Sequence, residues 1–177
     1  MKQFSYYQLP EACAGLGSRM AGNRVAAAIL ALALGGLGGS AYGASCTVSS
    51  SGVNFGVYNI FSTADHDDTG IITVTCTGLL LIGVSYTIRL STGGSNSYAS
   101  RLMSDGAGHS LAYNLYTNSS HTTVWGDGTG GTGTVSAVFL LGILTQHRDH
   151  DIYGRIFKEQ NAYAGSYNDS ITITISY

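Results

Sequence analysis

Two short runs of the sequence collect side chains that could bind a metal ion. They are Asp65-His66-Asp67-Asp68 and His147-Arg148-Asp149-His150-Asp151. Alternate carboxylates in the first run suit Ca²⁺, and the two histidines of the second could contribute to a Zn²⁺ site. Neither run holds a full ligand set, and the first lacks the glycine and distal glutamate of an EF-hand loop. We therefore expect solvated polar loops, with no metal and no cofactor.

Residues for nucleophilic or acid–base catalysis are present but follow no catalytic motif. Serine, histidine and aspartate are available for a triad, yet the chain has no Gly-x-Ser-x-Gly elbow. Glu159 is the only glutamate after residue 43, which leaves few acids for glycoside hydrolysis. A phosphate-cradling Gly-x-x-x-x-Gly-Lys-Ser/Thr loop is also missing from the sequence. The sequence therefore predicts that the protein is not an enzyme.

Aromatic side chains suggest binding to a surface or a sugar instead. The chain has 12 tyrosines against 5 phenylalanines, and its single tryptophan, Trp125, precedes a Gly-Asp-Gly turn. Aromatic faces stack on ligands, and tyrosine offers both area and a polar tip. For Tyr113 and Tyr116 the favoured alternative is cross-strand pairing within a sheet. Trp125 is the best single candidate for an adhesive aromatic residue.

Cysteine usage predicts one structural disulfide. Cys46 and Cys76 are the two cysteines left once residues 1–43 are set aside. An even pair in an exported protein favours a bridge, whereas metal binding lacks the usual Cys-x-x-Cys spacing. In the chain-entropy model, closing a loop of about 31 residues contributes roughly 3.5 kcal/mol.

The first 43 residues are predicted to be a signal peptide. Residues 25–34 are an unbroken apolar run that follows Arg24 and precedes a glycine-rich stretch. This run is too short to span a bilayer but suits a signal-peptide core, and small residues precede a cleavage site before Ala44. A short buried helix is the alternative. Residues 1–19 would form an unusually long n-region that carries Glu11, so we expect translation to begin at Met20.

Composition limits the function of the predicted mature chain, residues 44–177. It has five basic and nine acidic residues, a net charge of −4, and no cluster of Lys or Arg. Nucleic acid is therefore an unexpected partner. With 44% hydrophobic and only 10% charged residues overall, the chain can bury a core and is not expected to be disordered.

Period-two alternation predicts short strands joined by glycine-rich turns. The last strand is the most regular, because Ile171, Ile173, Ile175 and Tyr177 alternate strictly with threonine and serine. Such strands favour an antiparallel β-sandwich, with a closed barrel as the rival architecture. The predicted strands are 47–58, 71–77, 84–90, 111–117, 132–144, 151–157 and 170–177.

The order and spacing of several landmarks resemble the spore coat protein U domain family, which includes pilins of archaic chaperone–usher pili. The resemblance covers essentially all of residues 44–177. Its landmarks are Cys46, Val53-Asn54-Phe55-Gly56-Val57-Tyr58, the strand ending at Cys76, 86–91, Arg101-Leu102-Met103, 111–116, Trp125-Gly126-Asp127-Gly128, 153–156, Gln160, Gly165-Ser166-Tyr167 and the C-terminal strand.

The resemblance implies an immunoglobulin-like sandwich that lacks its final strand. Such a domain is handled by a periplasmic chaperone and an outer-membrane usher, and is completed by a donor strand from another pilin subunit. We expect the acceptor edge at Ile171, Ile173, Ile175 and Tyr177, because the chain stops there and exposed edges invite strand addition. An ordinary, complete sandwich is the alternative.

The segment ahead of Cys46 limits the expected role in a fibre. A donor strand needs on the order of ten alternating residues, and only Ala44 and Ser45 follow the predicted cleavage site. We expect a subunit that accepts a strand without donating one, and therefore a tip-proximal or coat position. The predicted function is an exported structural or adhesive subunit of a surface pilus or coat. The alternative is a monomeric secreted carbohydrate-binding module.

Overall fold

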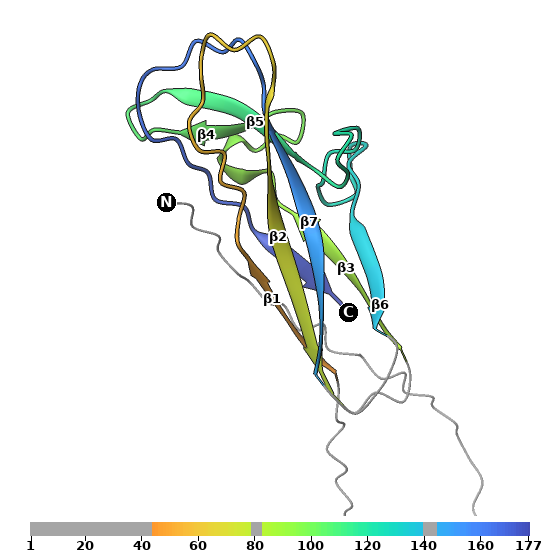
Figure 1. Ribbon diagram of the computed structural model, residues 1–177. Helices are drawn as coiled ribbons and strands as arrows, with labels where there is room; N and C mark the ends of the chain where they lie inside the picture. The colour runs from red at the N-terminus through yellow and green to blue at the C-terminus, as the bar shows by residue number, and fades with distance from the viewer. Residues whose placement is uncertain (1–43, 79–82, 140–144) are drawn as a thin grey trace, which may run out of the picture.

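The computed structural model describes residues 44–78, 83–139 and 145–177, which form an all-β domain (Figure 1). The predicted signal peptide, including Met20, lies outside the described residues. A short 3-10 helix, η1 (Gly93–Ser95), follows β3, and no α-helix occurs in the described part of the chain. The strands are β1 (Ser45–Ser50), β2 (His66–Thr77), β3 (Val84–Leu90), β4 (Arg101–Ser104), β5 (Ser110–Tyr116), β6 (Val135–Phe139), β7 (Gln146–Ile156) and β8 (Ile173–Ser176).

The strands form two antiparallel sheets. One has the order β1-β2-β7-β5-β4 and the other the order β6-β3-β8. The long strands β2 and β7 pair from His66↔Ile156 to Cys76↔Gln146, and Figure 1 shows them side by side along the molecule. This confirms the predicted antiparallel sandwich, and the strands do not close into a barrel.

The core lies between the sheets and follows the alternation of the sequence. On β2 the side chains of Ile72, Val74 and Cys76 are buried, while the threonines between them face outward. Tyr86, Ile88 and Leu90 do the same on β3. The predicted disulfide is confirmed, because Cys46 and Cys76 face each other in register across β1 and β2 and are bonded.

The predicted strand 47–58 is wrong over its second half. β1 ends at Ser50, and residues 51–59 form no strand. Gly52 and Gly56 adopt positive φ values of 68° and 66°, which interrupt the extended backbone. Val53 and Phe55 are buried as expected, but Val57 is 87% exposed, so the three side chains do not share a face.

Two glycines of the central strands let segment 51–55 cross the larger sheet closely. A Cβ atom on Gly70 of β2 would lie 2.1 Å from the carbonyl oxygen of Gly52. A Cβ atom on Gly154 of β7 would lie 2.6 Å from the Phe55 ring and 2.8 Å from Val53. All three distances are well inside van der Waals contact, so a side chain at either position would force its neighbours to move, backbone atoms at Gly70 and side-chain atoms at Gly154.

Replacing Gly70 with alanine should therefore destabilise the fold. The new methyl group would meet backbone atoms of Gly52, which cannot rotate away as a side chain can. We expect a loss of about 2–3 kcal/mol, in the range of overpacked cores, measured as a lower urea midpoint of the refolded chain. Gly165→Ala is the control, because its methyl group would meet nothing closer than 3.6 Å. Equal midpoints for the two variants would contradict the close crossing.

A fully buried arginine joins the two sheets near one end of the sandwich. Arg101 of β4 donates hydrogen bonds from Nε and Nη2 to the carbonyl oxygen of Ser91, at 3.1 and 2.8 Å. Nη1 donates to Oδ1 of Asn114 at 2.7 Å, and Nη2 also donates to the carbonyl oxygen of Trp125 at 2.7 Å. Burial lowers the pKa of Arg101 below its usual value, but a guanidinium stays charged. The side chain thus fixes three segments with one group.

Candidate functional site

The last strand lies at the edge of the smaller sheet. β8 pairs with β3, and no described strand pairs with its other side. Ile171, Ile173 and Ile175 point into the core and are buried, whereas Tyr177 is 45% exposed. β1, at the edge of the larger sheet, lies beside β8 (Figure 1). Two sheet edges therefore face each other at the position where the sequence predicted an acceptor edge.

A groove continues from these edges between two segments outside the strands. Segment 51–60 follows β1, segment 162–171 precedes β8, and between them lies a cavity of about 1100 Å³. We call this space the lateral groove. The apolar part of its wall comes from the larger sheet, through β4, β5 and β7, as well as from the two segments. Its apolar lining includes Phe55, Val57, Tyr58, Ile60, Met103, Leu111, Ile156, Ala162, Tyr163, Ala164 and Tyr167.

A narrow second cavity adjoins the first along the same path. It has a volume of about 20 Å³ and shares Phe55 and Met103 with the larger cavity. Ile171 and Asp169 form its wall toward β8. The lateral groove is thus wide between 54–60 and 162–167 and narrow where it approaches β8.

Asp169 anchors the segment that leads into β8. Its Oδ2 accepts a hydrogen bond from the hydroxyl of Tyr113 at 2.8 Å, and its Oδ1 accepts one from the backbone N–H of Gly94 at 2.9 Å. Burial, and the charge of Asp169, raise the pKa of Tyr113 well above its usual value. The tyrosine therefore remains a donor, and the carboxylate stays fixed at the narrow end of the groove.

At the wide end of the lateral groove, hydrogen bonds join residues about a hundred positions apart. The Tyr58 hydroxyl donates to the carbonyl oxygen of Phe157 and accepts from the backbone N–H of Gln160, both at 3.0 Å. The Gln160 side chain in turn exchanges hydrogen bonds with the backbone of Ala112. Figure 1 shows the loops after β1 and β7 meeting at this end of the molecule. Tyr58 and Gln160 thereby connect the two flanks of the groove.

Apolar side chains also project from the wide end. Val57 is 87%, Phe61 86% and Tyr163 65% exposed. The Tyr163 ring stacks on His109 with ring centroids 4.1 Å apart. Val57 and Tyr163 line the cavity and give the mouth of the lateral groove an apolar rim.

The predicted role of Trp125 as an adhesive aromatic residue is wrong. Trp125 is 0% exposed. Its Nε1 donates to the carbonyl oxygen of Ile88 at 3.2 Å, and its backbone N–H donates to the carbonyl oxygen of Leu115. The residue packs between the sheets and offers no face to a ligand. Trp125 is followed by a glycine-rich turn, and this local sequence does not predict that the side chain is buried.

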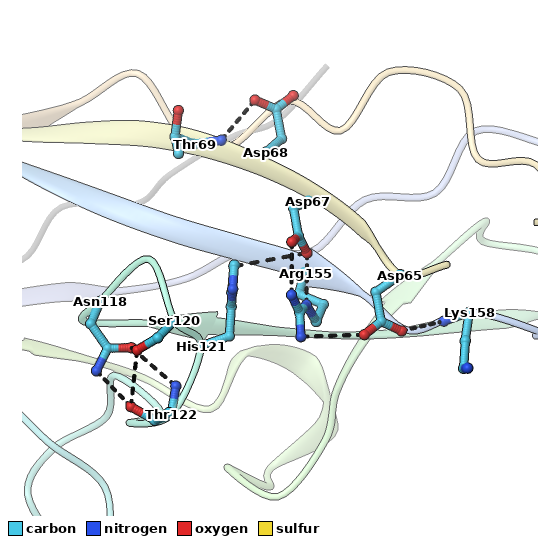
Figure 2. A network of polar contacts seen from close by, with 10 residues as sticks. All are labelled: Asp65, Asp67, Asp68, Thr69, Asn118, Ser120, His121, Thr122, Arg155 and Lys158. Carbon is cyan, nitrogen blue, oxygen red and sulfur yellow. Dashed lines mark hydrogen bonds and ion pairs between the residues drawn. The ribbon is translucent and has the colours of Figure 1, made fainter. Parts of the chain in front are cut away.

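The first polar run, expected as a solvated loop, instead enters β2 at His66 and forms ion pairs there. Arg155 donates to both carboxylate oxygens of Asp67, at 2.7 and 2.8 Å, and lies 3.3 Å from Asp65. The backbone N–H of Lys158 donates to Asp65 at 3.0 Å. Figure 2 shows Arg155 between the two aspartates, which leaves their oxygens committed to a cation already present.

The second polar run was also expected as a solvated loop, but it lies in β7, where successive side chains face opposite sides of the sheet. His147 is exposed, whereas His150 is half-buried and hydrogen-bonds the Tyr86 hydroxyl at 2.7 Å. Burial lowers the pKa of His150 below its usual value. The two histidines therefore do not converge. Within the described residues, no group of three or more His, Cys, Asp or Glu side chains could hold a metal ion.

The side chain of His121 is only 7% exposed, and sequence analysis did not single this histidine out. Its Nε2 lies 3.8 Å from Asp67 and has no hydrogen-bond partner among the described residues. The residue has a positive φ of 53°, in a loop that Asn118 holds together through the backbone N–H of Thr122 (Figure 2). Its ring contacts Tyr116 and Tyr153 edge-on. No nearby motif in the sequence signals this arrangement.

The ion pair of Asp67 should make stability depend on pH. Hydrogen bonds from Arg155 hold the pKa of Asp67 below its usual value of about 3.9, so the native state favours the carboxylate. Its contribution is therefore complete at neutral pH and is lost as the pH falls through the lowered native pKa. We expect Asp67→Asn to lower the urea midpoint at pH 7, with little difference from the unchanged chain at about pH 2.

Asp68→Asn is the matched control for that measurement. Asp68 accepts from the N–H of Thr69 and points away from Arg155 (Figure 2). A pH-independent loss in Asp67→Asn, or the same profile in both variants, would contradict the role of the ion pair.

Comparisons with known proteins place this geometry in context. The model of the Spore Coat Protein U domain matches residues 38–174. A solved chaperone–tip adhesion subunit pre-assembly complex, from the archaic chaperone–usher Csu pili of Acinetobacter baumannii, contains a similar chain with a TM-score of 0.53 and 20% identity. The similarity covers 76% of this chain and 40% of that chain. No curated protein matches. Within the described residues, no helix is long and apolar enough to cross a membrane.

Proposed function

The chain belongs to the Spore Coat Protein U domain family, and we propose that it is an exported structural or adhesive subunit of a chaperone–usher surface pilus or coat. In this proposal the lateral groove and the adjoining edge of β8 accept a β-strand from a partner subunit. The protein has no catalytic role, and it reaches the cell surface through the periplasm.

The observation that carries the proposal is the open edge of β8 beside the lateral groove. An added strand would form main-chain hydrogen bonds with β8 and place alternate side chains into the groove. The apolar surface that it buries contributes roughly 25 cal/mol of binding free energy per Å². The buried side chains of Ile171, Ile173 and Ile175 fix the strand, while its backbone edge faces the incoming chain.

The proposed partners are a periplasmic chaperone, an outer-membrane usher and other pilin subunits. The solved complex with the similar fold pairs a chaperone with a tip adhesion subunit of a chaperone–usher pilus. A chaperone strand would occupy the edge before assembly, and a subunit strand would replace it. The apolar rim of Val57 and Tyr163, with the exposed Phe61 side chain, supports contact with a surface or a neighbouring subunit. A tip-proximal position in the fibre remains a prediction, which immunogold labelling of intact fibres tests.

Periplasmic expression of the full chain, with and without a cognate chaperone, tests the proposal. With the chaperone we expect a soluble one-to-one complex, and without it we expect aggregation, degradation or self-association. The alternative, a carbohydrate-binding module, predicts a soluble monomer in both cases. A monomer that is equally soluble and protease-resistant in both strains would contradict strand acceptance.

A further inference from the structure

The ring of Phe55 forms part of the wall of both cavities of the lateral groove. On its other side the ring is seated against Gly154 of β7. A Cβ atom at position 154 would lie 2.6 Å from Cζ and 2.9 Å from Cε1 of the ring. The ring therefore occupies a notch that exists because residue 154 has no side chain.

The backbone of Phe55 is anchored by a hydrogen bond, and its ring makes aromatic and van der Waals contacts. Nε2 of His66 donates a hydrogen bond to the carbonyl oxygen of Phe55 at 2.5 Å. The ring contacts Tyr113 edge-on, with centroids 6.1 Å apart. Because the surrounding core is close-packed, a ring displaced from the notch can move toward the cavities that it lines. Any side chain at position 154 would therefore push Phe55 into the lateral groove.

We propose that Gly154 is a positioning residue that sets the width of the lateral groove. By holding Phe55 back, it lets the wide cavity receive a bulky apolar side chain from the partner strand. This inference rests on the proposed function, in which the occupant is an extended strand of another subunit. The narrow cavity of about 20 Å³ admits no comparable side chain, so the groove selects where the bulky residue must lie.

Gly154 differs from Gly70 in what its missing side chain would meet. At Gly70 the nearest atoms are backbone atoms of Gly52, so a substitution there acts on the fold. At Gly154 they are side-chain atoms of Phe55 and Val53, which can shift while the strands stay paired. Gly154→Ala should thus change the groove more than it changes stability.

Binding of synthetic peptides to the refolded full chain tests the inference. The probes are peptides of about ten residues that alternate threonine with valine, enough for a strand along segment 51–60. In one series phenylalanine replaces each valine in turn, and in the matched series alanine does. We expect the unchanged chain to bind the best phenylalanine peptide about tenfold more tightly than its alanine counterpart. Gly154→Ala should reduce this preference to about twofold or less.

The double variant Gly154→Ala with Phe55→Leu supplies the rescue. Leucine lacks the ring atoms that meet the new methyl group, so the preference for phenylalanine should return. A preference that survives in Gly154→Ala, or that the double variant does not restore, overturns the inference. An unchanged chain that binds none of the peptides instead contradicts the proposed function itself.

A second variant keeps the test decisive if Gly154→Ala does not fold. Phe55→Trp keeps the glycine notch but places a larger ring at the same wall of the groove. It should lose the preference for phenylalanine while its circular dichroism spectrum and melting profile stay close to those of the unchanged chain. Retention of the full preference by a folded Phe55→Trp variant would also overturn the inference.

Discussion

Replacing Arg101 with methionine should lower the free energy of unfolding by about 3–5 kcal/mol, because three buried neutral acceptors lose their donor at once. Methionine fills a similar volume but donates no hydrogen bonds. The carbonyl oxygens of Ser91 and Trp125 and the Oδ1 atom of Asn114 would then lose buried donors. An unsatisfied buried acceptor costs about 1–3 kcal/mol, so the loss exceeds that of the side chain's contacts alone.

Urea unfolding of the refolded chain, followed by tryptophan fluorescence, measures this effect. The signal comes from Trp125, whose carbonyl oxygen accepts from Arg101. Arg89→Met is the matched control, because Arg89 donates to Ser176 on the solvent side of the smaller sheet. Its loss should stay within about 0.5 kcal/mol. Similar midpoints for the two variants would show that Arg101 does not organise the core as described.

Removing the disulfide should be almost as damaging. Cys46→Ala with Cys76→Ala opens a loop whose ends are 30 positions apart, which costs about 3.5 kcal/mol in the chain-entropy model. Both sulfur atoms lie in the core, so the change also removes buried contacts. We expect a lower urea midpoint and a lower yield of folded chain.

A reducing agent provides the control for the disulfide. Dithiothreitol should bring the midpoint of the unchanged chain close to that of the double variant, and should leave the double variant unaffected. If dithiothreitol changes neither protein, the bridge contributes nothing to the native fold. The pH profile of Asp67→Asn can be recorded in the same series of urea unfolding measurements. Its ion pair lies on the outer face of the sheet, whereas the disulfide lies in the core.

The sequence predicted the regular strands because their alternation is local. Residues 171–175 and 72–76 alternate without interruption, and the structure buries the predicted faces of both segments. The pairing Cys46–Cys76 followed from counting alone. Strand β2 begins earlier than predicted, at His66, because Asp67 pairs with Arg155 across the sheet. That extension depends on a residue 88 positions away, which no local pattern contains.

The lateral groove was only partly predictable for the same reason. The edge at β8 could be expected from the alternation and the family resemblance. The wide cavity could not, because it depends on Gly52 and Gly56 turning the backbone and on Gly154 receiving the Phe55 ring. Tyr58 and Gln160 were landmarks of the resemblance, but the sequence alone did not predict the hydrogen bond between them. Trp125 failed as a surface residue because its burial is set by Ile88 and Leu115 of two different strands.

The covalent link between β1 and β2 also bears on the proposed role, in which the protein is part of a fibre that can be pulled. When mechanical force stretches the domain, the residues between Cys46 and Cys76 cannot lengthen, because the bridge carries the load past them. Thirty residues would otherwise supply about 100 Å of extension. An intact disulfide therefore limits how far the domain can extend under force, and a reduced disulfide would let the domain extend further.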